Sequence, residues 1–141
     1  IDAAILPDLP LVESGPWREA ASNVGIETIM LAAPTTPDHR LPELCEASKG
    51  FVYAVGLLGV TGERAALAAT ATEIAKRCKE VTDKPVLTGV GIGSPEQAVE
   101  ASSVADGVII GSAVVRRLLD GGGAEGVGDL VAAYRAALDA G

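Results

Sequence analysis

The chain has 141 residues, of which 48% are hydrophobic and 21% are charged, and its formal net charge at neutral pH is -8. This length suffices for one buried core, and the composition is typical of a soluble globular protein. The negative charge argues against non-specific binding to nucleic acid or to anionic lipid, because those partners are themselves anions.

The sequence carries no signal for export, membrane spanning or metal binding. It has no apolar run of about 18 residues and no charged start followed by an apolar signal core, so we expect a cytoplasmic protein outside any membrane. Cys45 and Cys78 stand apart, with neither a second cysteine nor a histidine at metal-ligand spacing. We therefore expect reduced thiols, no metal and no cofactor. The strand-like pattern begins at Ile1 without an initiator Met, which predicts that the sequence starts within a fold.

Short apolar runs alternate with helical patterns along the chain, which is the order typical of a parallel α/β protein. The apolar runs predict strands over residues 3–6, 28–32, 51–55, 86–88 and 107–110. Helices are expected over residues 14–24, 37–47, 66–81, 95–103, 113–119 and 128–140. Ser94 is predicted to cap its helix, with Pro95 at the first helical position. The glycines at 121–123 predict a turn between the last two helices, and we expect residues 1–141 to form a single α/β segment.

Two glycine-bearing stretches each end a predicted strand and lead into a helix. The first is Thr88-Gly89-Val90-Gly91-Ile92, and the second runs from Gly107 to Ala113. Glycine lets the backbone approach a ligand closely, and the free N–H groups at a helix start point at an anion. In parallel barrels the loops after the last two strands commonly bind a substrate phosphate. The pair therefore predicts a phosphate-binding site.

One connection is much longer than the others. Strand ends recur at a regular interval except between Tyr53 and Gly89, and the surplus lies at Gly56–Arg64. This segment has three glycines and little helical periodicity. Long loops in compact domains are often functional, so we predict a lid over the strand ends; a plain surface loop is the alternative.

Several motifs together resemble the tryptophan synthase alpha subunit family. They are Pro7-Asp8-Leu9-Pro10 with Glu13-Ser14, Tyr53 followed by Gly59-Val60-Thr61-Gly62, Gly89-Val90-Gly91-Ile92 before Ser94-Pro95-Glu96-Gln97, and Gly111-Ser112-Ala113. The resemblance covers essentially the whole chain. It implies a (β/α)8 barrel that cleaves indole-3-glycerol phosphate to indole and glyceraldehyde 3-phosphate and passes indole to a beta subunit. A complete barrel typically needs about 250 residues, so this chain would supply about strands 4 to 8.

The same resemblance implies roles for individual residues. The substrate phosphate would be held by backbone N–H groups of glycines in the three loops and by Ser112. Tyr53 would border the substrate, an apolar wall would surround its indole, and Thr61 would close with the lid. The implied substrate-binding residues are Ile5, Leu31, Tyr53, Thr61, Gly62, Gly91, Gly111 and Ser112. Asp8 and Pro10 would lie near the beta subunit.

The family's catalytic Glu and Asp are expected upstream of this sequence, so we assign no catalytic residue within it. Asp8 is the only carboxylate at a predicted strand end, but a strand-end Asp flanked by prolines is typical of a turn or an interface. His39, the only histidine, is interpreted as a solvated residue at a helix start. We therefore do not expect this chain to catalyse the cleavage by itself.

Half a barrel would leave two unpaired sheet edges and exposed aliphatic side chains. We therefore expect the chain to self-associate, to recruit the missing N-terminal half of the barrel, or to be less stable. Two other functions stay open. One is a segment of another phosphate-binding barrel enzyme, and the other is a non-catalytic half-barrel that serves as an association or ligand-binding module.

Overall fold

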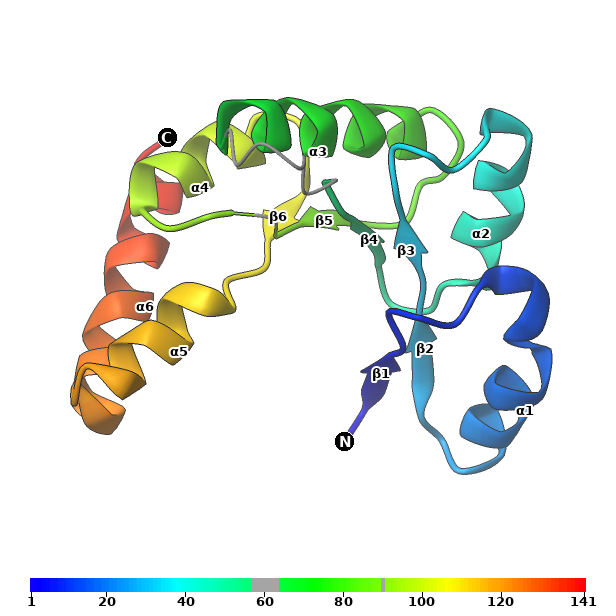
Figure 1. The fold of residues 1–141 in the computed structure, drawn as a ribbon, viewed down its shortest axis with the longest axis horizontal. Coiled ribbons are helices and arrows are strands. Elements are labelled where there is room, and N and C mark those ends of the chain that lie inside the picture. Colours follow the sequence, from blue (N-terminus) through cyan, green and yellow to red (C-terminus); the bar gives the residue numbers. More distant parts are fainter. Residues whose placement is uncertain (57–63, 90) are drawn as a thin grey trace.

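In the computed structural model, the parallel strands form two sheets that follow one curve, with helices along its outer side (Figure 1). The structure describes residues 1–56, 64–89 and 91–141, and the side chains of residues 64–69 are outside that description. Strands β1 (Ala3–Ile5) and β2 (Glu27–Ile29) pair with each other, and β3 (Leu31–Ala32), β4 (Val52–Ala54), β5 (Val86–Thr88) and β6 (Gly107–Val108) pair in that order. Every pairing among these strands is parallel, as the alternating pattern predicts.

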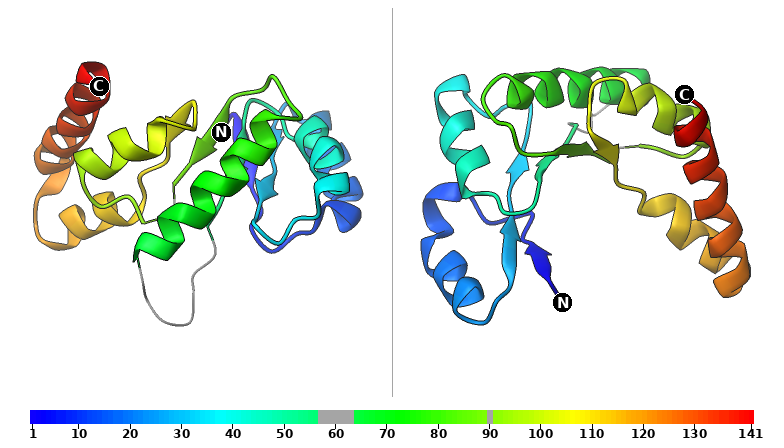
Figure 2. Two further views of the ribbon diagram at one scale, coloured as in Figure 1. Left: turned by 90° about the horizontal axis from the view of Figure 1, so that it is seen from above. Right: turned by 180° about the vertical axis from the view of Figure 1, so that it is seen from behind.

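The helices follow the strands in the expected order. The first strands are followed by η1 (Leu11–Glu13), α1 (Gly15–Asn23), η2 (Asp38–Arg40) and α2 (Leu41–Ala47). The later strands are followed by α3 (Arg64–Lys79), α4 (Pro95–Ser102), α5 (Ser112–Leu119) and α6 (Gly123–Ala140). The two views in Figure 2 place α5 and α6 side by side at the carboxyl-terminal end of the fold.

The predicted strand over residues 28–32 is divided in two. Its first part pairs with β1 and its second part with β4, because the chain moves from one neighbour to the next at Met30. The Met30 amide donates to the Ser48 hydroxyl at 2.8 Å, so it is diverted from the strand ladder. This contact joins residues far apart in sequence, and local periodicity could not reveal it.

The last helix begins earlier than predicted, at Gly123 rather than near residue 128. The turn before it is tight, because Gly121 adopts a positive φ of 82° and the Gly122 amide donates to the Arg117 carbonyl at 2.9 Å. The predicted helix-to-helix turn is confirmed, but it occupies only Asp120 to Gly122.

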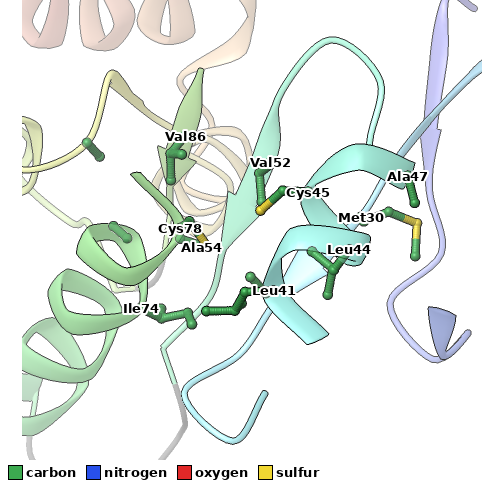
Figure 3. Close-up of a cluster of buried hydrophobic side chains, with 13 residues drawn as sticks. Met30, Leu41, Leu44, Cys45, Ala47, Val52, Ala54, Ile74, Cys78 and Val86 are labelled. Atoms are coloured by element: carbon green, nitrogen blue, oxygen red, sulfur yellow. The ribbon is translucent and has the colours of Figure 1, made fainter. Parts of the chain in front are cut away.

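The main core lies between the outer face of the sheet and helices α2 and α3 (Figure 3). Alternate residues of the strands supply one side of it, and Leu41, Leu44 and Ile74 supply the other. Because side chains alternate along a strand, the residues between them point to the inner side of the curve. The inner residues Leu31, Tyr53 and Leu87 are only half-buried.

Candidate functional site

The two predicted phosphate-binding glycines lie at the same edge of the sheet. Strands β5 and β6 are parallel, with Thr88 opposite Val108. Gly91 follows Thr88 by the same number of residues as Gly111 follows Val108. The Ile109 amide donates to the Thr88 carbonyl at 2.7 Å, so the two strands stay paired up to the edge. The two loops that contain Gly91, Gly111 and Ser112 therefore leave the sheet at the same carboxyl edge.

Backbone amides are available at this edge. Within the described chain, the N–H groups of Gly91, Gly111 and Ser112 donate no hydrogen bond to another residue. Gly91 has a positive φ of 73°, a conformation that favours glycine, and a Cβ on Gly111 would meet open space. Ser112 begins α5, so its amide carries the partial positive charge of a helix start. This arrangement can receive an anion.

The loop after β5 is held by the cap of α4. As predicted, Ser94 is the N-cap, and its hydroxyl accepts from the Gln97 amide at 3.4 Å. The Gln97 side chain in turn accepts from the Gly93 amide at 2.7 Å. A hydrogen bond with the Ser94 side chain lowers the pKa of the Glu96 carboxyl, which therefore stays negative at the helix start. The Gly93 amide is therefore already used within the loop, whereas the Gly91 amide donates to no other residue of the described chain.

Tyr53 lies on the inner face with its hydroxyl beside this loop. An ideal Cβ on Gly89 would be 2.7 Å from the Tyr53 hydroxyl oxygen and 2.7 Å from the Ile109 Cβ, so only glycine fits between them. Burial raises the pKa of the Tyr53 phenol, so the hydroxyl stays protonated at neutral pH. Tyr53 can therefore donate a hydrogen bond close to the candidate anion site.

The predicted apolar wall shares this inner face. Leu31 is in register with Tyr53, and Tyr53 is in register with Leu87. Ile5 is in register with Ile29, which lies on the same face as Leu31 because two residues along a strand point the same way. Leu31 and Tyr53 are thus neighbours on the inner face of the four-stranded sheet, whereas Ile5 belongs to the separate pair β1–β2.

Asp8 and Pro10 are exposed, and they line a cavity of about 190 Å³ beside the carboxyl ends of β1 and β2. Trp17, Met30 and Leu44 contribute to its walls, so most of the cavity is apolar. No side chain positions Asp8 as a proton donor or acceptor in the described part of the chain. The role of Asp8 at an interface stays a prediction.

Two predicted residues, Thr61 and Gly62, lie outside the described residues, as does most of the predicted lid at Gly56–Arg64. The remaining predicted substrate-binding residues are all described.

Among the described residues, no group of three or more His, Cys, Asp or Glu side chains could hold a metal ion. Cys45 and Cys78 are both buried in the main core. A hydrogen bond with Cys45, together with burial, raises the pKa of the Cys78 thiol, and a metal would require the thiolate. Within the same described chain, no helix is long and apolar enough to cross a bilayer.

The family model described as "Tryptophan synthase alpha chain" matches residues 1–134. This chain belongs to the tryptophan synthase alpha chain family. The tryptophan synthase alpha chain of Streptomyces coelicolor is 47% identical to it over 132 residues, which are 91% of this chain and 49% of that relative. This chain therefore spans about half the length of the curated alpha chains that it matches.

Solved structures of this family have the same fold. A structure of Mycobacterium tuberculosis tryptophan synthase matches with a TM-score of 0.80 at 39% identity, covering 95% of this chain and 50% of that one. Tryptophan synthase subunit alpha from Campylobacter jejuni matches with a TM-score of 0.68 at 32% identity, covering 81% of this chain and 46% of that one. The predicted fold class, a partial (β/α)8 barrel, is confirmed.

Sequence reasoning missed three residues around the candidate site of this alpha-chain segment, namely Leu87, Ile109 and Tyr134. Leu87 stands between the buried Val86 and Thr88, but this alternation appears only in the structure. Ile109 lies in a continuous apolar run whose residues are all half-buried, so no alternation marks it either. Tyr134 is 2% exposed in the last helix, and no local signal connects it with the glycine loops.

Proposed function

We propose that this chain forms the phosphate-binding half of a tryptophan synthase alpha subunit, a carbon-carbon lyase of tryptophan biosynthesis. The reaction would be cleavage of indole-3-glycerol phosphate to indole and glyceraldehyde 3-phosphate. The observation that carries the proposal is the set of free amides of Gly91, Gly111 and Ser112, brought to one sheet edge by the register of β5 and β6.

The proposed substrate spans the edge and the inner face of the sheet. Its phosphate would accept hydrogen bonds from these amides and from the Ser112 hydroxyl, which is exposed at the start of α5. Tyr53 would lie beside the glycerol and indole portions, and Ile5 and Leu31 would contact the indole ring. Thr61 and Gly62 belong to the same proposal through the family resemblance alone.

Cleavage needs groups that the proposal places elsewhere. A carbon-carbon bond is broken when one group protonates the indole ring carbon while another accepts a proton, each within hydrogen-bond reach. We assign these roles to a Glu and an Asp of the N-terminal half of the barrel, so this chain by itself would be inactive. The proposed partners are that half and a beta subunit near Asp8 and Pro10, in the cytoplasm.

Calorimetric titration of the 141-residue chain tests the proposal. The ligands are indole-3-propanol phosphate, an unreactive substrate mimic, and inorganic phosphate. We expect both to bind, with the indole compound tighter because it also contacts the apolar wall. Ser112→Asp is expected to abolish both, since it places a negative charge at the anion site. Ser103→Asp, the same change on an exposed residue at the far end of α4, is the matched control.

The other outcomes separate the alternatives. Equal affinity for both ligands would favour another phosphate-binding barrel enzyme. A chain that is folded by circular dichroism and binds neither ligand would overturn the proposal that this half holds the phosphate, and would favour a non-catalytic association module.

A further inference from the structure

A second, smaller core lies directly behind the candidate phosphate site. It consists of the buried residues Ile92, Ala98 and Tyr134, and it is separate from the main core between the sheet and helices α2 and α3. Tyr134 is the largest fully buried side chain of the described residues. The cluster joins the loop after β5 to α4 and α6.

The cluster also contacts both glycine loops of the candidate site. Ile92 directly follows Gly91 in the chain, and Ile110, which directly precedes Gly111, packs against the same cluster. The side chains next to the two anion-binding glycines are therefore held by one packing unit. A change in the volume of that unit must alter the separation of the two backbones, because protein interiors are close-packed.

Helix α6, which carries Tyr134, is tied to the end of α5. The Arg117 guanidinium, near the end of α5, donates to the Gly126 carbonyl at 3.2 Å. Ideal Cβ atoms on Gly122 and Gly126 would lie 2.8 and 2.7 Å from the Arg117 Nε, so the two helices approach closely. Helix α6 also packs along α4, as the views in Figure 2 show. It therefore bridges the helices that follow the two glycine loops.

We propose that Tyr134 is a positioning residue for phosphate binding: its ring fills the cluster behind the site and sets the separation of the Gly91 and Gly111 amides. The inference rests on the proposed function, since it concerns the same anion site. The ring carries this role, because the Tyr134 hydroxyl has no hydrogen-bond partner in the described chain. Loss of the hydroxyl should accordingly leave the site intact.

Titration with inorganic phosphate tests the role of the ring. Tyr134→Ala is expected to weaken phosphate binding by about tenfold or more, since small misplacements of binding groups have large effects. Tyr134→Phe is expected to bind as the unaltered chain does. The control is Ile74→Ala, which opens the main core and should reduce stability without changing the phosphate affinity. Tyr134→Leu replaces the alanine variant if that variant does not fold.

A second measurement needs no ligand. In ¹H–¹⁵N spectra we expect Tyr134→Ala to shift the amide resonances of both Gly91 and Gly111, and Ile74→Ala to leave them in place. Unchanged glycine resonances, or equal loss of affinity in the Ile74 variant, would overturn the positioning role. An unaltered chain that binds no phosphate would count against the proposed function. Equal phosphate affinity in the unaltered chain and in Tyr134→Ala would count against the role of Tyr134 alone.

Discussion

The two faces of the curved sheet differ in how completely they are buried. On the outer face, Val52, Ala54 and Val86 are 0% exposed beneath helices α2 and α3. On the inner face, the neighbouring residues Leu31, Tyr53 and Leu87 are half-buried. The same strands thus supply a closed core on one side and an accessible apolar surface on the other.

This difference separates stability from ligand binding. Burial of apolar area stabilises a fold in proportion to the area removed from water, so the outer face contributes most of that free energy. The inner face contributes less and leaves room for a ligand beside the free amides. Residues of the two faces should therefore respond differently to substitution.

The largest expected effect is in the main core, where Ile74 of helix α3 packs with the outer face of the sheet. Ile74→Ala should lower the free energy of unfolding by about 2–5 kcal/mol, because it removes fully buried methyl groups and leaves a cavity. Leu31→Ala on the inner face should cost about 1 kcal/mol, because its side chain is already partly in water. Urea denaturation measures both. Equal losses at the two positions would contradict the division between the faces.

A smaller loss of stability is expected when the hydrogen bonds from Lys84 to the end of α2 are removed. The Lys84 ammonium donates to the carbonyls of Cys45, Glu46 and Ser48 at 2.8–3.0 Å, at the end of α2. Lys84→Met should lower the free energy of unfolding by about 1–2 kcal/mol, since these bonds satisfy orphan carbonyls and the lysine is 30% exposed. Urea denaturation again measures the free energy of unfolding.

Glu46→Gln is the control: its side chain is 86% exposed and 3.7 Å from the ammonium, so no measurable loss of stability is expected. A loss of the same size in both variants would assign the effect to the ion pair.

The smallest expected effect is the contribution of Asp106 to the pH dependence of stability. The hydrogen bond from Lys79, with a second one from the Val86 amide, lowers the pKa of the Asp106 carboxyl. A lowered folded-state pKa adds stability above the unfolded value of about 3.9, and this stability is lost as the pH falls through the folded value. Urea midpoints measured from neutral pH to pH values below about 4 should fall less steeply for Asp106→Asn than for the unaltered chain. Asp120→Asn, which removes the same charge at an exposed position outside the ion pairs of the described chain, should leave the slope unchanged.

Local patterns predicted most of the elements because their causes are local. Ser94 and Pro95 specify the start of α4 through a cap and a fixed φ, and the structure has both features. The glycines around 121 predicted the turn between α5 and α6 for the same reason. The division of the strand at Met30 involves Ser48, which lies 18 residues further along the chain. No periodicity in the sequence reports such contacts.

The sequence by itself determined the order of the parallel strands and helices, the two glycine loops and the family to which the chain belongs. Each of these depends on short-range spacing of apolar residues, caps and glycines. Only the tertiary structure decided that Thr88 pairs with Val108, and that Tyr134 shares one cluster with Ile92 and Ile110. These facts depend on strand register and on packing between distant segments, which form only when the whole chain buries its apolar surface.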